Sequence, residues 1–306
     1  MPALLLHSLS EHREVIFGCL EAVKASRVVE VGSESGGFTM ELAAWAAAAG
    51  AHSASIEPFP TDQIRELAAT SESFSLVTER SPAGLSLLEP ADAYLLDGDH
   101  TYWTVFHELR EIARLATDRD HPLVVLHDVG WPCGRRDQYY APDLLPPEGV
   151  HPHAFDRGVV PGDPGVVLGG FRGEGAYAVA LHEGGPANGV LTAVEDYLDG
   201  AADLAYAHVP SVFGLGVIYS KSSPAADPLA ELLAPYDRSP QLARLEANRL
   251  ELLLRVISLQ DALAGQDRAK SRLVLTYAER LAAVEAENTA LRLDRLRLRT
   301  ALGRDT

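Results

Sequence analysis

The segment that most constrains the fold is residues 28–39, which read VVEVGSESGGFT. Three β-branched valines at its start are typical of a buried strand. The glycines that follow permit positive φ angles and close backbone approach, and helix-forming residues continue over 38–49. A strand, a glycine turn and a helix N-terminus together form a corner that can bind a nucleoside or nucleotide.

The spacing inside this corner narrows the class of ligand. It is Glu-x-Gly-x-x-x-Gly-Gly rather than the Gly-x-Gly-x-x-Gly of dinucleotide-binding corners. Glu34 stands where that pattern needs the glycine that lets the backbone approach a pyrophosphate. The corner therefore suits a nucleoside ligand without a pyrophosphate, and its candidate binding residues are Glu30, Gly32, Ser33 and Gly36.

The charge of the chain bears on its partners. The formal net charge is −17, which argues against non-specific nucleic-acid binding because that needs a basic surface. Residues 241–306 carry 12 Lys and Arg against 9 Asp and Glu, whereas the preceding residues carry 14 against 34. The C-terminal segment is therefore a different kind of region from the rest of the chain.

The cysteines and the apolar runs bear on location. Two cysteines allow neither a disulfide framework nor a cysteine zinc site, so we expect a reducing, cytoplasmic setting. The first residues have a short apolar run and no basic leader, which does not match a signal peptide. No run of 18 apolar residues exists, and no transmembrane helix or membrane partner is expected.

Strand and helix patterns alternate along the chain and predict an α/β fold with a doubly wound, Rossmann-like parallel sheet. We expect strands at 27–32, 53–57, 74–78, 91–96, 123–127, 204–209 and 214–220. We expect helices at 11–26, 38–49, 62–70, 104–116 and 189–198. On this basis residues 1–222 form one domain.

Residues 131–188 interrupt the alternation with a Pro- and Gly-rich insert that we expect to be a long irregular loop. Its place after the fifth strand favours a lid over the ligand site. Arginine beside aromatic residues suits an anionic or sugar ligand, so Arg136 and Tyr140 are candidate substrate contacts. A surface ion-pair cluster is the alternative for the arginines.

Residues 223–306 read as helix only and predict a coiled-coil or oligomerisation segment. Apolar residues keep a heptad spacing over 245–263, the pattern breaks at Gly265, and a second seam runs over 277–302. Asn288 falls at an a position of that seam, where a buried Asn fixes register and strand number. We expect a homo-oligomer; the buried Asn indicates a dimer, and a trimer is left open. A helical hairpin folded onto its own domain is the alternative to self-association.

Polar residues gather where the predicted strands end, at the edge of an open parallel sheet where ligands bind. Glu57 ends the second strand, and a carboxylate there can accept both hydroxyls of a ribose. A solvated strand-end residue is the alternative for Glu57. Ser81 follows the third strand and is a candidate for approaching an adenine, with a simple turn residue as the alternative.

The ends of the fourth and fifth strands predict a reaction centre. Asp97 follows one apolar strand, and His127 with Asp128 follows the next, so we expect these side chains within a few ångströms of one another. Two carboxylates and an imidazole can hold a divalent cation. His100, three residues after Asp97, is a candidate general base. The alternative is a hydrogen-bonded core histidine at 127 and a helix-capping Asp99.

These motifs make residues 27–220 resemble a class I S-adenosyl-L-methionine (SAM) methyltransferase, which has a mostly parallel seven-stranded sheet. The strings HDVGWPCGRRDQYY (127–140) and HEGGPANGVLTAVEDYL (182–198) resemble an actinobacterial subset of that family. Similar metal-dependent O-methyltransferases carry a metal-binding Asp at the end of strand four, matched by Asp97, and two ligands after strand five, matched by His127 and Asp128. The resemblance also implies a base at position 100 and Asp97 near the cofactor. His127 departs from the usual oxygen ligand.

The resulting expectation is a SAM-dependent O-methyltransferase with His100 as base and a cation such as Mg²⁺, acting on a small polar or sugar-containing natural product. An NAD-binding oxidoreductase is an alternative, disfavoured by Glu34 in the glycine turn. A non-catalytic SAM-binding protein that serves as a coiled-coil partner is another, disfavoured by the intact strand-end carboxylates.

Overall fold

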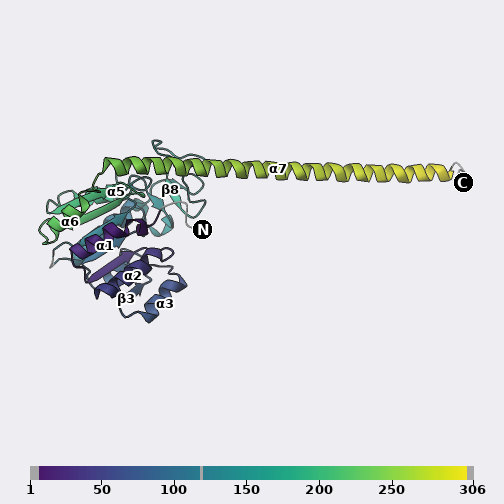
Figure 1. Cartoon of the computed structure of the whole chain (residues 1–306). Coiled ribbons are helices and arrows are strands. Elements are labelled where there is room, and N and C mark those ends of the chain that lie inside the picture. Colours follow the sequence, from purple (N-terminus) through teal and green to yellow (C-terminus); the bar gives the residue numbers. More distant parts are fainter. Residues whose placement is uncertain (1–6, 118–119, 302–306) are drawn as a thin grey trace. The chain divides into compact units, whose positions relative to one another are not determined.

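The computed structural model describes residues 7–117 and 120–301. Its central feature is a sheet flanked by helices (Figure 1). The sheet has seven strands in the order β3-β2-β1-β4-β5-β10-β9. Strand β10 runs antiparallel to both of its neighbours, and the other pairings in this sheet are parallel. The strands are β1 (Arg27–Val31), β2 (His52–Ile56), β3 (Phe74–Val77), β4 (Ala93–Leu96), β5 (Leu123–His127), β9 (Leu204–Val209) and β10 (Leu215–Ser220).

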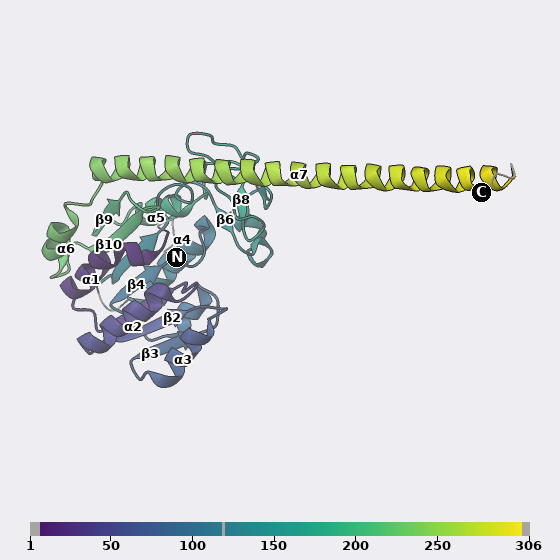
Figure 2. The ribbon, with the colours of Figure 1, turned by 45° about the vertical axis from the view of Figure 1, so that its right-hand side comes forward.

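Helices cover both faces of the sheet and enclose two apolar cores (Figure 2). Alternate residues of a strand enter different cores: Val28 packs with α1, α2 and α6, whereas Val29 packs with α4 and α5. The helices are α1 (Arg13–Ala22), α2 (Gly37–Ala49), α3 (Asp62–Thr70), α4 (Tyr102–Leu115), α5 (Val190–Leu198), α6 (Ala226–Leu233) and α7 (Pro240–Ala301). Short 3₁₀ turns occupy Leu9–His12, Ala83–Leu87, Pro142–Leu144 and Pro147–Gly149.

The predicted fold class is confirmed. The sheet is mostly parallel, and its order reverses beside β1. The expected strands and helices lie within two residues of their predicted bounds, apart from the end of the first helix. The first helix is shorter than 11–26 because a 3₁₀ turn precedes it and a left-handed Lys24 follows it. A sheet with this order and a final antiparallel strand is the Rossmann-like methyltransferase fold.

The insert departs from the predicted irregular loop. It contains a small antiparallel sheet of order β6-β8-β7, made of β6 (Gln138–Tyr139), β7 (His153–Ala154) and β8 (Ala178–Ala180). Strands of two or three residues are too short to show an alternating pattern in the sequence. Tyr139, Ala178 and Ala180 form a core of their own there.

Contacts divide the chain into two compact units, Met1–Leu254 and Arg255–Thr306. Helix α6 and the first turns of α7 therefore belong to the sheet domain, beyond the expected boundary at residue 222. Helix α7 is continuous through Gly265, so the two heptad seams lie on one helix and not on a hairpin. In the described residues, no helix has the length and apolar character needed to span a bilayer.

Candidate active site

The glycine turn brings the end of β1 against the end of β4. Gly32 has a φ of +86°, and a Cβ there would lie 2.5 Å from the Cα of Gly98 and closer still to the carbonyl oxygen of Asp97. Only glycine fits both the angle and the space. Gly36 has a φ of +87° and begins α2, but it does not line the cavity described below; a Cβ there would meet Ile64 at 3.1 Å.

Glu57 follows β2 and faces the same turn. One carboxylate oxygen accepts from the backbone N–H of Ser33 at 3.0 Å and the other from that of Phe59 at 2.9 Å. The Ser33 hydroxyl contacts the hydroxyl of Ser55. Two backbone donors hold the carboxylate of Glu57 in place while its other lone pairs remain available to a ligand in the cavity that it lines.

Glu30 is buried beneath the turn. Its carboxylate accepts from the Thr39 hydroxyl at 2.7 Å and from that of Ser33 at 3.5 Å. Burial raises the pKa of Glu30 to about 8, and the nearby charge of Asp97 adds to the rise. Glu30 thus ties the end of β1 to the first turn of α2, and it forms part of the cavity floor.

The neighbouring ends of β4 and β5 gather Asp97, His127 and Asp128, as predicted. One ligand atom from each lies within 4.8 Å of the others. Nδ1 of His127 is 3.1 Å from a carboxylate oxygen of Asp97 and 3.1 Å from one of Asp128. Nε2 of His127 donates to the carbonyl of Val212 at 2.9 Å, which directs Nδ1 toward the carboxylates.

This cluster suits either a proton or a divalent cation. Burial alone would lower the pKa of His127, but Asp97 and Asp128 raise it well above its usual value. Burial alone would raise the pKa of Asp97, yet His127 and His100 lower it to about 2. Two carboxylate oxygens and an oriented imidazole nitrogen are a donor set that fits a divalent cation.

His100 lies next to both carboxylates of the cluster and lines the cavity. Its Nε2 lies 3.2 Å from Asp128 and 3.5 Å from Asp97, and its Nδ1 lies 3.3 Å from the side-chain nitrogen of Gln138. Burial would lower the pKa of His100, but the charge of Asp128 raises it well above its usual value. The two carboxylates thus favour a proton on this imidazole as well as on that of His127.

The backbone that follows β5 is strained. Asp128 has a φ of +58°, and Val212 and Phe213 have φ values of +45° and +64°. The N–H of Gly130 donates to the carbonyl of Phe213 at 2.6 Å and so joins the two irregular segments. Left-handed angles at non-glycine residues cost energy and cluster at functional sites. Phe213 was not singled out by the sequence, although it lines the cavity.

One cavity of about 1380 Å³ is lined by Gly32 and Ser33 of the turn, by Glu57, and by Asp97 and Asp128 of the cluster; His127 does not line it. Residues of the insert form part of its wall, and a lid function of residues 131–188 stays a prediction. Tyr140 lines it with a ring centroid 5.9 Å from that of His100 and 6.0 Å from that of Tyr177. Its Phe, Tyr and Trp lining comprises Phe38, Phe59, Trp103, Tyr140, Phe171, Tyr177 and Phe213.

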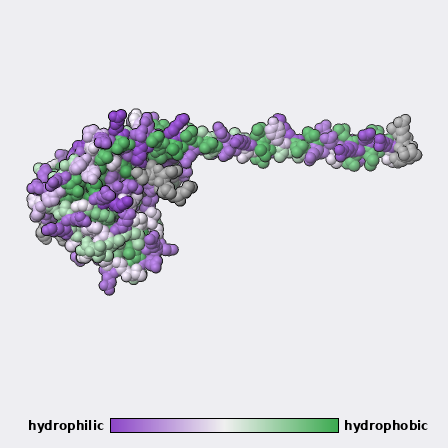
Figure 3. Space-filling model, in the orientation of Figure 1, coloured by the Kyte–Doolittle hydropathy of each residue, from purple (hydrophilic) through white to green (hydrophobic). Residues whose placement is uncertain are grey.

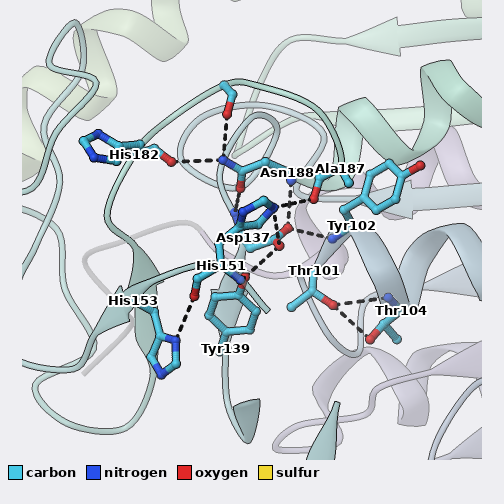
Figure 4. A network of polar contacts seen from close by, with 12 residues as sticks. Thr101, Tyr102, Thr104, Asp137, Tyr139, His151, His153, His182, Ala187 and Asn188 are labelled. Atoms are coloured by element: carbon cyan, nitrogen blue, oxygen red, sulfur yellow. Dashed lines mark hydrogen bonds and ion pairs between the residues drawn. The ribbon is translucent and has the colours of Figure 1, made fainter. Parts of the chain in front are cut away.

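Asp137 fastens the insert to the sheet domain. Its buried carboxylate accepts from the backbone N–H groups of Tyr102 and Gly189, each at 2.7 Å, and from the Tyr139 hydroxyl at 2.9 Å (Figure 4). The side chain of Asn188 accepts from the backbone N–H of Asp137 at 2.8 Å. These bonds join the starts of α4 and α5 to β6. No local pattern indicated this role, because the partners lie 35 to 52 residues apart.

Arg136 does not line the cavity, so the prediction that it contacts substrate has no support in the geometry. Its guanidinium is 1% exposed and donates to the carbonyls of Ala180, Pro164 and Gly165. An arginine that is surrounded by backbone acceptors holds the insert together. Arg135 instead forms an exposed ion pair with Glu195 at 2.6 Å, as the surface alternative expected.

Ser81 lines the cavity, but its hydroxyl donates to the buried carboxylate of Glu108 on α4. Burial raises the pKa of Glu108 to about 8. Glu108 lies on the buried, otherwise apolar side of the amphipathic helix α4. A charged residue at such a core-facing position is unusual, and this signal in the sequence could have indicated a buried hydrogen-bonding role. The adenine contact of Ser81 stays a prediction.

The model of a methyltransferase domain family matches residues 29–129. That stretch contains the glycine turn, Glu57, Asp97 and the His127–Asp128 pair. With the strand order, the match supports a class I, SAM-dependent methyltransferase domain in this part of the chain. The actinobacterial subset stays a prediction.

Solved structures with a similar fold include methyltransferases. The S-adenosylhomocysteine-bound methyltransferase PaMTH1 of Podospora anserina is 14% identical, with 68% of this chain and 78% of that chain covered and a TM-score of 0.41. The O-methyltransferase TomG of Streptomyces achromogenes is 15% identical, with 72% and 83% covered and a TM-score of 0.40. A putative O-methyltransferase from Klebsiella pneumoniae is 16% identical, with the same coverage and a TM-score of 0.38. No curated protein matches the sequence.

Proposed function

We propose that the domain transfers the methyl group of SAM to a hydroxyl oxygen of a small polar or sugar-containing natural product. The observation that carries this proposal is the shared cavity: the carboxylate of Glu57, placed to bind a ribose, lines the same space as the carboxylates of Asp97 and Asp128 and the imidazole of His100. The net charge of −17 supports a small-molecule acceptor over a nucleic acid. A cytoplasmic location stays a prediction.

The cofactor half of the site would bind SAM through the turn at Gly32 and Ser33, through Glu57, and beside Asp97. The fixed carboxylate of Glu57 would accept hydrogen bonds from the two ribose hydroxyls. The NAD alternative remains disfavoured because Glu34 lines the cavity at the position where a pyrophosphate would need close backbone approach.

In the acceptor half, the hydroxyl oxygen would attack the methyl carbon of SAM. A C–O bond forms, the S–CH₃ bond breaks, and S-adenosylhomocysteine leaves with the electron pair on sulfur. The hydroxyl proton would pass to the imidazole of His100, while Tyr140 closes the site above it. Much of the rate gain comes from holding the two reacting atoms together.

The residues that would hold a divalent cation are Asp97, His127 and Asp128. A cation there would lower the pKa of an acceptor hydroxyl and offset the carboxylate charge that otherwise keeps a proton on His100. His100 adjoins these residues, since its Nε2 lies within 3.5 Å of both carboxylates.

The test is formation of S-adenosylhomocysteine from SAM with a panel of hydroxylated acceptors. His100→Gln should lower kcat by roughly 10²- to 10⁴-fold, the range for loss of a general base. His107→Gln, another cavity-lining imidazole, is the matched control and should retain activity. Equal activity of the two variants would contradict the base assignment.

Cation dependence is tested separately by dialysis of the protein against a chelator. Activity should fall and return with added Mg²⁺ or another divalent ion. An unchanged rate after dialysis would contradict cation assistance but not the methyl transfer itself.

The alternative functions are tested by two further measurements. Titration calorimetry with S-adenosylhomocysteine and NAD distinguishes the methyltransferase from the oxidoreductase, and turnover of SAM excludes the non-catalytic alternative.

A further inference from the structure

The second unit carries a row of apolar side chains that no described residue covers. Six seam residues of α7 are more than half exposed: Val274, Tyr277, Leu281, Val284, Leu291 and Leu298. Leu250 is the buried residue of this helix in the described chain, and it lies in the first unit. Figure 3 shows apolar and polar side chains alternating along the helix. An exposed apolar row of this length marks an interaction surface.

The spacing of the row specifies a coiled coil. Val274, Leu281, Asn288 and Arg295 recur every seven residues, and Tyr277, Val284, Leu291 and Leu298 recur every seven residues in the d register. Four such heptads fill residues 274–301, which is enough for a stable seam. A strict seven-residue repeat imposes a left-handed supercoil with another helix of the same repeat.

The flanking charges select the partner. In a parallel coiled coil, the g residue of one helix faces the e residue of the next heptad on the other. The g and e positions here pair Arg280 with Glu285, Glu287 with Arg292, and Asp294 with Arg299. All three pairs join opposite charges when the second helix has this same sequence in the same register.

The polar core residue agrees with that arrangement. A parallel, in-register pair places Asn288 opposite Asn288 of the second copy, where the two amides can bond to each other. An antiparallel pair would place Asn288 against an apolar d residue and leave its amide unsatisfied. An antiparallel overlap that sets Asn288 against Val284 would bring Glu287 to Glu287 and Glu285 to Glu285 of the second copy.

We infer that residues 274–301 form a parallel, in-register, two-stranded coiled coil with a second copy of this chain. The full chain should have twice its 32.9 kDa mass in light scattering and sedimentation at micromolar concentration. Leu281→Asp with Leu291→Asp should give a monomer. Leu293→Asp with Leu296→Asp, equally exposed but off the seam, should stay a dimer. A monomeric or trimeric wild type, or dissociation of both variants alike, would overturn the inference.

Two further measurements test orientation and register. Leu298→Cys should form an interchain disulfide under mild oxidation, whereas Leu296→Cys should not; the native cysteines are both buried. Glu287→Arg should weaken the dimer roughly tenfold or more, and Arg292→Glu added to it should restore the affinity. Failure of Leu298→Cys to crosslink, or of the charge swap to restore binding, would exclude the parallel register.

A different set of contacts links the first turns of α7 to the reaction centre. The carboxylate of Glu246 accepts from the backbone N–H groups of Val212 at 3.0 Å and Phe213 at 2.9 Å, the two left-handed residues beside the cavity. Arg249 forms an ion pair with the same carboxylate at 2.6 Å, and its guanidinium carbon lies 4.4 Å from the centroid of the Phe213 ring. The carbonyl of Val212 in turn accepts from Nε2 of His127.

We also propose that Glu246 is a positioning residue for His127, an inference that rests on the proposed function. Its carboxylate holds the Val212–Phe213 turn, and the turn fixes the imidazole whose Nδ1 faces Asp97 and Asp128. Loss of the carboxylate should loosen the cluster while leaving the cofactor half, at Glu57, unchanged.

Glu246→Gln tests this, with Glu251→Gln on the exposed side of the same helix as control. In Glu246→Gln, calorimetry should show a roughly tenfold lower Mn²⁺ affinity and an unchanged S-adenosylhomocysteine affinity. A turnover assay should show kcat reduced by roughly the same factor. A tenfold loss is typical of residues that orient metal ligands. Equal losses for both ligands, or none, would overturn the positioning role. A wild type that neither turns over SAM nor binds Mn²⁺ would instead refute the proposed function.

Discussion

Gly32 offers the sharpest test of how the cofactor corner is built. In Gly32→Ala the new Cβ would lie 2.5 Å from the Cα of Gly98, 2.6 Å from the carbonyl carbon of Asp97, and closer still to that carbonyl oxygen. These are backbone atoms of β4 and its exit, so no side-chain rotation relieves the contact. The φ of +86° adds strain that any L side chain would feel.

The expected cost is the sum of two effects. Overpacking costs about 1–3 kcal/mol and a left-handed non-glycine residue about 1–2 kcal/mol, so we expect a loss of about 2–5 kcal/mol in the free energy of unfolding. Because the displaced atoms carry Asp97, S-adenosylhomocysteine should also bind more weakly.

The assay is denaturant unfolding of Gly32→Ala beside Gly37→Ala, with calorimetric titration of S-adenosylhomocysteine for each. Gly37 is the matched control because it follows the same turn and lines the same cavity. A Cβ added at Gly37 would have no atom within 4 Å. Gly37→Ala should unfold like the wild type or slightly later, since alanine favours the helix. If Gly32→Ala proved as stable as Gly37→Ala, the close approach of β1 and β4 would be wrong.

Three further substitutions address the cofactor, the pH response and the insert. Glu57→Gln should weaken S-adenosylhomocysteine binding roughly tenfold or more, measured by calorimetry, because it loses about 1.5–3 kcal/mol of charged hydrogen bonding; unchanged affinity would exclude the ribose role. The folded-state pKa of Glu108, raised by burial from 4.5 to about 8, means that the folded protein keeps this proton longer than the unfolded chain, so stability falls as the pH rises through that window. Glu108→Gln cannot lose the proton, and its unfolding curves should show a shallower decline from pH 5 to 8; a slope equal to that of the wild type would contradict burial as the cause. Arg136→Lys should lower the free energy of unfolding by about 2–4 kcal/mol, since a Lys cannot reach all three carbonyls, while Arg135→Lys at an exposed ion pair should change it by less than about 1 kcal/mol. Similar thermal shifts for the two arginines would refute the buried role.

The sheet and the place of the site could be predicted from local residue patterns. Runs of β-branched residues and the glycine turn are local signals, since a strand's period and a positive φ depend on neighbours a few residues away. The meeting of Asp97 with His127 and Asp128 also followed, because the carboxyl ends of neighbouring parallel strands share one edge. The heptad repeat of residues 274–301 is likewise a local pattern that can be identified in the sequence.

Which polar residues face the cavity, and which hold the chain together, became clear only in the folded protein. Arg136 looked like a substrate ligand until carbonyls from two distant parts of the insert surrounded it. The hydrogen bond between Glu246 and Val212 joins residues 34 positions apart in the sequence, and the one between Val212 and His127 joins residues 85 positions apart. Irregular segments carry no period, so their contacts depend on packing between parts of the chain that no local pattern relates. The nucleoside corner was therefore readable from VVEVGSESGGFT, whereas the support behind its reaction centre required the folded molecule.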